Sequence, residues 1–210
     1  MTALPALLVL TDRTACRRPL LDVLRAAVDG GARAVVLREK DLPAGERARL
    51  VEQVHGLLAA VDGLLVVAGG DPLGGAPPAV HLAATEPVPD PRPALVGRSC
   101  HGAVEVARAA AEGCDWTTVS PVWETASKPG HGPALGPAGL ARLVAGGPPA
   151  YALGGVTPER APLCRAAGAV GVAVLGAVMT ADRPERAVAA LLAALQDPPG
   201  WRESPARDRS

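Results

Sequence analysis

The sequence predicts an α/β fold, a single (β/α)8 TIM barrel, and two observations lead to this prediction. Eight short apolar runs lack polar alternation, which is typical of strands buried on both faces of a parallel sheet. Amphipathic stretches with helical spacing lie between most of these runs. An open sheet with fewer strands is the alternative. The predicted strands are residues 6–11, 34–37, 63–67, 79–82, 94–98, 116–119, 150–153 and 172–175.

The amphipathic stretches supply the predicted helices. The first begins at Pro19, has Leu20, Leu24 and Val28 at helical spacing, and ends at Gly30. The next ones cover residues 45–60, 104–112 and 137–145, then a stretch that begins at the hydroxyl cap Thr157, and finally residues 182–195.

Two connections are too rich in glycine and proline for good helices. These are residues 69–78 and 85–92, which follow the third and fourth predicted strands. We therefore expect the third and fourth helices of the barrel to be short or missing.

The length and composition suit one enzyme-sized domain. The chain has 210 residues, of which 49% are hydrophobic, so it can bury a large core. We expect residues 1–197 to form the barrel and residues 198–210, which carry prolines and charges, to form a disordered tail.

The same composition argues against several classes of partner. Aromatic residues make up only 2% of the chain, and 21 basic residues balance 21 acidic ones, so neither nucleic acid nor a membrane surface is an expected partner. The sequence shows no signal-peptide pattern or membrane span, and its four cysteines have no metal-binding spacing. We expect a cytoplasmic protein.

Two cations follow the second predicted strand. Arg38 and Lys40 are two residues apart, and in an extended chain such residues point to the same side, with Glu39 directed away. Two convergent cations at a strand end suit a phosphate or diphosphate. A solvated charge cluster at a strand edge is the other interpretation of these residues alone.

Glycines follow the last two predicted strands. Gly154 and Gly155 come after the seventh strand, and Gly176 comes after the eighth. In barrels the active site lies at the carboxyl ends of the strands, and the last two of these loops often bind phosphate. Glycines there let the backbone approach an anion closely, although each could serve only a tight turn.

The connection after the sixth strand offers further polar groups. Thr125, Ser127 and Lys128 supply two hydroxyls and a cation on a segment rich in glycine and proline. Such a long connection is more often functional than an idle surface loop. His81 lies within a strand pattern and His101 follows a strand end, so we expect structural or positioning roles for both.

Several short motifs occur along the chain in the order found in a known enzyme family. They are Leu10-Thr11-Asp12, Leu37-Arg38-Glu39-Lys40-Asp41, Val80-His81-Leu82, Gly97-Arg98-Ser99-Cys100-His101, the segment from Ser120 to Lys128, Leu153-Gly154-Gly155-Val156 and Gly171-Val172-Ala173-Val174. Through them the chain resembles the thiamine phosphate synthase / thiazole tautomerase family over about residues 6–195.

The resemblance implies a barrel enzyme of thiamine biosynthesis. In the synthases, hydroxymethylpyrimidine diphosphate is joined to a thiazole phosphate and diphosphate leaves. Mg²⁺ and basic residues stabilise that leaving group, which is electrostatic catalysis. The resemblance assigns catalytic roles at the diphosphate to Arg38, Lys40 and Lys128, and diphosphate binding also to Ser99. It assigns the thiazole phosphate to Thr125, Ser127, Gly155, Leu175 and Gly176.

Departures from the family pattern concern the metal. The synthases usually carry Asn-Asp-Arg after the third strand, where this chain has Ala68-Gly69-Gly70. The carboxylates left as candidate Mg²⁺ ligands are Asp71 and Glu86.

Three hypotheses follow, in this order. The first is a synthase, a transferase with an altered metal site. The second is a metal-free thiazole tautomerase acting on thiazole phosphate carboxylate, although the acid/base histidine implied for tautomerases is Pro121 here. The third is a non-catalytic protein that binds a phosphorylated ligand. All three imply small phosphorylated molecules as partners, and a homo-oligomer is compatible with the sequence.

Overall fold

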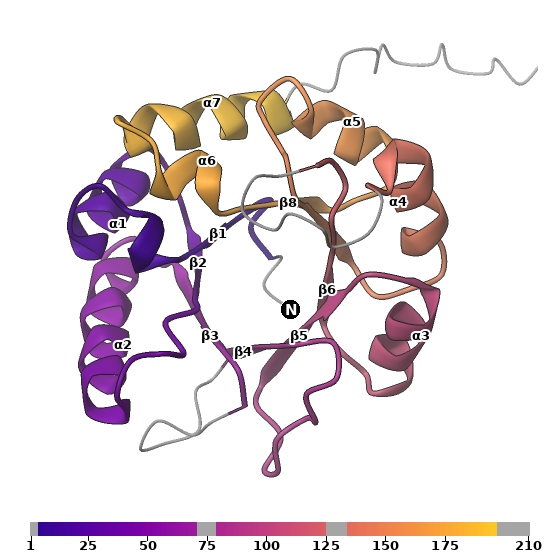
Figure 1. Cartoon of the computed structure of the whole chain (residues 1–210), viewed down its shortest axis with the longest axis horizontal. Helices are drawn as coiled ribbons and strands as arrows, with labels where there is room; N and C mark the ends of the chain where they lie inside the picture. The colour runs from indigo at the N-terminus through magenta and orange to yellow at the C-terminus, as the bar shows by residue number, and fades with distance from the viewer. Residues whose placement is uncertain (1–3, 71–78, 125–133, 197–210) are drawn as a thin grey trace, which may run out of the picture.

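Eight parallel strands form a closed barrel in a computed structural model that describes residues 4–70, 79–124 and 134–196 (Figure 1). Each strand pairs with the next in the sequence, and β8 pairs with β1. The predicted (β/α)8 barrel is therefore confirmed, and the open sheet is not found. The strands are β1 (Leu7–Leu10), β2 (Ala34–Leu37), β3 (Leu64–Ala68), β4 (Ala79–Leu82), β5 (Leu95–Cys100), β6 (Trp116–Val119), β7 (Ala150–Leu153) and β8 (Gly171–Val174).

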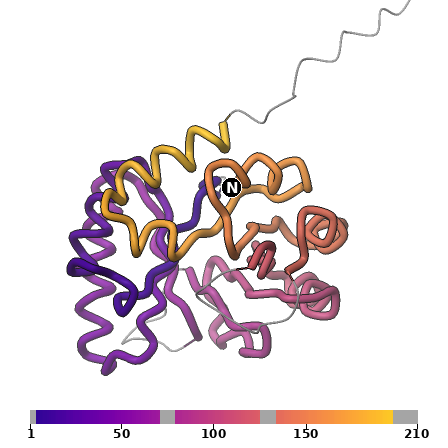
Figure 2. The backbone as a smooth tube through the Cα atoms, turned by 45° about the horizontal axis from the view of Figure 1, so that its top comes forward, coloured from indigo at the N-terminus to yellow at the C-terminus, as the bar shows by residue number. Residues whose placement is uncertain are grey.

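Helices surround the barrel (Figures 1 and 2). Their lengths match the amphipathic stretches closely, except that α5 begins at Ala161 and not at Thr157. Thr157 O instead accepts hydrogen bonds from the N–H groups of Arg160 and Ala161, so a turn precedes the helix. The helices are α1 (Leu20–Asp29), α2 (Ala44–Ala59), α3 (Ala103–Ala111), α4 (Gly136–Val144), α5 (Ala161–Ala166), α6 (Gly176–Met179) and α7 (Pro184–Gln196), with a short 3₁₀ helix η1 (Arg13–Ala15).

The strands bury apolar side chains on both faces, as their unbroken apolar runs predict. One set, including Val35 and Leu37, packs outward against the helices. The alternate set, including Val36, Trp116 and Tyr151, fills the barrel interior. Gly97 on β5 makes room for the indole of Trp116, because a Cβ atom at that position would lie 2.1 Å from Trp116 Cε2.

The amino-terminal end of the barrel is closed by the chain that precedes β1. Leu4 packs against the interior cluster, and the hydroxyl of Tyr151 donates a hydrogen bond to Pro5 O at 2.7 Å. This closure leaves the opposite end, where the strands finish, as the open end of the barrel.

The connection from β4 to β5 contains no helix in residues 83–94, as expected for the fourth helix. The fully buried Arg98 of β5 holds this connection instead. Arg98 Nη1 donates hydrogen bonds to the carbonyls of Ala83 (2.8 Å), Ala84 (3.1 Å) and Glu86 (2.8 Å). Its other terminal nitrogen forms an ion pair with Glu112. One buried guanidinium therefore fixes the turn that carries Glu86.

Two expectations lie outside the described residues. The predicted gap in place of the third helix falls mainly on residues 71–78, and the predicted tail falls on residues 198–210. Among the described helices, none has the length and apolar character that crossing a bilayer requires.

Candidate active site

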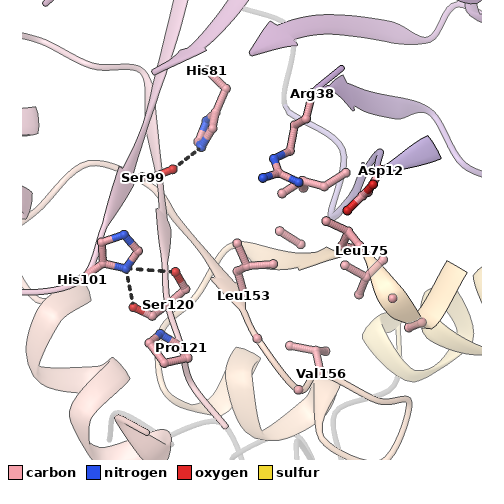
Figure 3. A pocket seen from close by; sticks show the side chains of 17 residues that line it. Asp12, Arg38, His81, Ser99, His101, Ser120, Pro121, Leu153, Val156 and Leu175 are labelled. Atoms are coloured by element: carbon pink, nitrogen blue, oxygen red, sulfur yellow. Dashed lines mark hydrogen bonds between the residues drawn. The ribbon is translucent and has the colours of Figure 1, made fainter. Parts of the chain in front are cut away.

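A cavity of about 240 Å³ opens at the carboxyl ends of the strands (Figure 3). Most of its lining comes from the inward-pointing positions of the strands and the residues just beyond them, so the barrel register itself places these side chains together. The polar lining residues are Asp12, Arg38, His81, Ser99, His101 and Ser120, and the apolar and glycine ones are Leu10, Pro121, Leu153, Gly154, Gly155, Val156, Ala173, Val174, Leu175, Gly176 and Ala177.

Arg38 is the cation of this cavity among the residues described. It stands two positions beyond Val36, on the inward side of β2, and Figure 3 shows its guanidinium directed into the cavity. Thr11 at the end of β1 contacts both the backbone and the guanidinium of Arg38. Arg38 N–H donates to Thr11 Oγ1 at 2.9 Å, and Arg38 Nη1 donates to Thr11 O at 3.3 Å. A guanidinium held in this way is preorganised for an anionic ligand.

Lys40 lies beside the cavity and is not part of its lining. The expectation that Lys40 and Arg38 face one spot assumed an extended chain, but β2 ends at Leu37. Lys40 N–H then bonds to Arg38 O at 2.5 Å, which turns the backbone. The Lys40 ammonium is directed to Glu86, with Nζ 3.3 Å from Oε2.

Glu39 points away from the cavity, as predicted, and joins the ends of β1 and β2. Glu39 is only 2% exposed, and its carboxylate accepts the backbone N–H of Arg13 at 3.1 and 3.2 Å. The Arg13 guanidinium bridges Glu39 and Asp41, with bonds of 2.7 and 2.6 Å to Asp41. These hydrogen bonds hold the pKa of Asp41 below its usual range. The sequence showed these charges but not that they pair across 26 or more residues.

His81 forms part of the cavity wall in its neutral form. Its Nε2 lies 3.1 Å from Ser99 Oγ and 3.2 Å from Thr118 Oγ1, on the two strands that follow β4 (Figure 3 shows the Ser99 contact). Burial, together with the nearby charges of Arg38, Lys40 and Arg98, lowers the pKa of His81 to about 3. His81 therefore carries no charge near neutral pH and orients hydroxyl groups in the wall.

His101 is oriented by the end of β6. Its Nδ1 lies 2.8 Å from Ser120 O and 3.2 Å from Ser120 Oγ. Because a carbonyl oxygen only accepts, we assign the proton of neutral His101 to Nδ1. Nε2 then retains a lone pair that can accept a hydrogen bond.

Glycine turns form the side of the cavity that β7 and β8 supply. Gly154 and Gly155 both have positive φ, of 98° and 63°. A Cβ atom on Gly155 would lie 2.7 Å from Trp123 Cβ, so the turn excludes larger residues. Arg160 braces the turn, because its Nη1 donates to Gly155 O at 2.7 Å while its guanidinium lies 5.2 Å from the centre of the Trp123 ring.

The turn after β8 completes this side. Leu175 and Gly176 line the cavity, and Gly176 begins the short helix α6, which the sequence did not predict because four residues carry no periodic signal. The structure thus brings together Arg38, Ser99 and the two glycine turns of the predicted site. The predicted residues Thr125, Ser127, Lys128 and Asp71 lie outside the described residues.

Glu86, a predicted metal ligand, has other partners in the structure. Its Oε1 accepts the N–H of Gly70 and its Oε2 accepts the N–H of Ala83, both at 3.0 Å, and Oε2 also faces the Lys40 ammonium. Mg²⁺ prefers near-octahedral oxygen coordination, and proteins usually hold it through one or two carboxylates together with substrate phosphates and water. Across residues 4–70, 79–124 and 134–196, no three acidic, histidine or cysteine side chains gather, so these residues form no all-protein metal cage. Glu86, with both oxygens bonded to backbone N–H groups and one facing an ammonium, is itself poorly suited as a magnesium ligand.

Comparisons with known proteins agree on one family. The family model described as thiamine monophosphate synthase matches residues 7–178. A thiamine-phosphate synthase of Roseiflexus castenholzii is 36% identical over 87% of this chain and 85% of its own length. One of Thermus thermophilus is 35% identical over 81% of this chain and 86% of its own length.

A solved structure shares the whole fold. The thiamine phosphate pyrophosphorylase of Pyrococcus furiosus superposes with a TM-score of 0.79 at 25% identity, covering 92% of this chain and 96% of that one.

Proposed function

The chain belongs to the thiamine monophosphate synthase family, and we propose that it joins hydroxymethylpyrimidine diphosphate to a thiazole phosphate. In this reaction the bond between the pyrimidine methylene carbon and the diphosphate oxygen breaks, and its electron pair leaves with diphosphate. The thiazole nitrogen then forms a bond to that carbon, which gives thiamine phosphate.

The observation that supports this proposal is that a guanidinium and two glycine turns, each suited to an anion, line one cavity. Arg38 lies on the β2 side, and the glycine turns at Gly155 and Gly176 lie on the β7 and β8 side. Two phosphorylated substrates need two such places, with their reacting atoms between them. The aliphatic side chains of Leu10, Leu153 and Leu175 lie among these polar groups and suit the faces of two heterocyclic rings.

In this proposal a charged side chain binds the diphosphate, and uncharged backbone groups bind the thiazole phosphate. Arg38 stabilises the negative charge that develops on the departing diphosphate, and the hydrogen bond of its guanidinium to Thr11 O reduces the rearrangement this needs. The glycine turns bind the thiazole phosphate through backbone N–H groups. Neutral His81 holds Ser99 in place and takes no part in proton transfer. Lys128, Thr125 and Ser127 complete this assignment as predictions from the family resemblance.

A direct assay tests the proposal. Purified protein is incubated with both substrates, with Mg²⁺ and separately with excess EDTA, and thiamine phosphate is measured after oxidation to its fluorescent thiochrome. We expect product, and we expect Arg38→Met to lower kcat/KM at least about 100-fold, because a charged hydrogen-bond donor to the leaving group is lost. Absence of product at every protein concentration, despite binding of both substrates, would refute the proposal.

The same preparation separates the alternatives. Incubation with thiazole phosphate carboxylate alone tests isomerisation, which needs neither the pyrimidine substrate nor metal. Binding of phosphorylated ligands without either reaction would leave the non-catalytic hypothesis. Each of the synthase relatives described above favours the transferase.

A further inference from the structure

The carboxylate of Glu86 is built into the protein as an acceptor of hydrogen bonds. Each of its oxygens receives a backbone N–H at 3.0 Å, one from Gly70 after β3 and one from Ala83 after β4. The two amides hold the carboxylate between the ends of two neighbouring strands. They also hold the pKa of Glu86 below its usual range, together with Lys40. Glu86 is therefore a fixed negative charge.

The turn that carries Glu86 is fixed in its own right. Buried Arg98 donates to three of its carbonyls, including Glu86 O at 2.8 Å, and is itself paired with Glu112. Both the backbone and the side chain of Glu86 are thus held in place before any ligand arrives.

Lys40 occupies the space beside this carboxylate. Its Nζ is 3.3 Å from Glu86 Oε2. Gly69, at the end of β3, has φ +93°, and a Cβ atom there would lie 3.1 Å from both Cε and Nζ of Lys40 and 3.3 Å from Glu86 Oε1. The ammonium group therefore fills the place into which a side chain at position 69 would project.

A divalent cation at Glu86 would meet this ammonium. Two positive groups on one carboxylate oxygen repel each other. In addition, the hydrogen bonds from the backbone N–H groups of Gly70 and Ala83 already use one lone pair on each Glu86 oxygen. The ammonium has three donors, and among the described residues one of them contacts Glu86, which leaves two for a ligand there. Arg38, two residues before Lys40 in the sequence, supplies a second cation in the cavity wall.

We propose that the Glu86 carboxylate holds the Lys40 ammonium in position, as a seat for it, and does not bind a metal ion. The site formed by Glu86 and Lys40 then binds a diphosphate group without a divalent cation. The inference rests on the proposed function, because the diphosphate of the pyrimidine substrate is the ligand it assigns. Gly69 contributes to this site, because the absence of a side chain at position 69 leaves space for the Lys40 ammonium.

Calorimetric titration with inorganic diphosphate in excess EDTA tests the seat. We expect the wild-type protein to bind. Lys40→Met should weaken binding about ten-fold or more, since an ammonium contact to the anion is lost. Glu86→Gln should also weaken it several-fold, because the ammonium is no longer held. Gly69→Ala should also weaken it, since the new Cβ would force a small shift of the Lys40 ammonium and would strain the backbone at φ +93°.

Arg25→Ala is the matched control. It removes one positive charge from α1, where Arg25 is exposed and paired with Asp22. It should leave diphosphate binding unchanged, which separates the local seat from the overall charge. Urea unfolding of each variant identifies any loss of binding that comes from a loss of folding. Glu86→Gln keeps the size of the native residue and one of its two contacts with backbone N–H groups, because the NH₂ group of glutamine cannot accept the other.

The possible outcomes test metal-free diphosphate binding at Glu86 and Lys40 separately from the proposed reaction. Binding that requires Mg²⁺ and is lost in EDTA would overturn the seat. So would a Glu86→Gln variant that binds diphosphate normally in EDTA and loses only a Mg²⁺-dependent part. Metal-free binding that depends on Glu86 and Lys40 supports the seat even where no thiamine phosphate forms, a result that would refute only the proposed function.

Discussion

The indole ring of Trp116 stacks against the imidazole ring of His81 inside the barrel, with ring centroids 6.2 Å apart and planes inclined by 19°. The contact exists because Gly97, on the strand between them, leaves the indole its space. A residue of the cavity wall therefore packs directly on the largest side chain of the barrel interior.

Replacing Gly97 should damage this packing. In Gly97→Ala the new Cβ would lie 2.1 Å from Trp116 Cε2, so the indole must move within a filled interior. We expect the free energy of unfolding to fall by about 3 kcal/mol, near the upper end for overpacked cores. Urea unfolding followed by tryptophan fluorescence measures the loss. Gly56→Ala, in α2 with no atom within 4 Å, should instead stabilise by about 0.5–1 kcal/mol. Equal effects of the two variants would contradict this account.

The neutral state of His81 should make stability depend on pH. The pKa of His81 in the folded protein is about 3, well below the ordinary value of 6.5, so below pH 6.5 the unfolded chain binds a proton that the folded protein does not. Stability is thus retained above pH 6.5 and lost as the pH falls toward 3. Between pH 6.5 and 5 we expect a loss of about 1.7 kcal/mol, because the slope reaches about 1.4 kcal/mol per pH unit only once the histidine of the unfolded chain is fully protonated.

The measurement compares wild type with His81→Asn by urea unfolding at both pH values. The variant lacks the titrating group, so its loss over this interval should be smaller by most of that amount. Parallel pH dependence in the two proteins would show that the pKa of His81 is similar in the folded and unfolded states, which would contradict the lowered value.

Arg98 and Arg108 offer a matched pair at one carboxylate. Both contact Glu112, but the Arg98 side chain is fully buried whereas that of Arg108 is 39% exposed. Arg98→Lys removes the planar fork that holds the 83–86 turn, and we expect a loss of about 3 kcal/mol. Arg108→Ala should cost less than about 1 kcal/mol. Thermal or urea unfolding of both variants measures the two losses in the free energy of unfolding. Similar losses would show that burial does not distinguish the two contacts with Glu112.

The turn after β7 should be sensitive to any side chain. Gly155→Ala places a Cβ 2.7 Å from Trp123 Cβ at a φ of +63°, which shifts the backbone N–H groups of the turn. We expect thiazole phosphate to bind at least about ten-fold more weakly, as measured by calorimetry. Gly146→Ala has comparable backbone strain at φ +80° but no atom within 4 Å and no place in the cavity lining, so it should leave affinity unchanged. Unchanged affinity in Gly155→Ala would remove this turn from the phosphate site.

The sequence predicted what depends on local pattern. Apolar runs without alternation located all eight strands to within a few residues, and strand ends pointed to Arg38 and to the glycines at 154–155 and 176. The turn that redirects Lys40 toward Glu86 was missed, because a single hydrogen bond to Arg38 O breaks the extended geometry. The pairing of Arg13 with Glu39 was missed for another reason, since it joins residues that only barrel closure brings together.

The way Arg98 holds the β4–β5 connection leaves that connection free to vary. Three of its hydrogen bonds end on backbone carbonyls, which every amino acid possesses. Ala83 and Ala84 can therefore change identity without losing the anchor, whereas a change at position 98 releases the whole segment at once. The shape of this turn therefore depends on the side chain at position 98 and not on those at positions 83 and 84, which can change while the backbone at position 86 keeps its place.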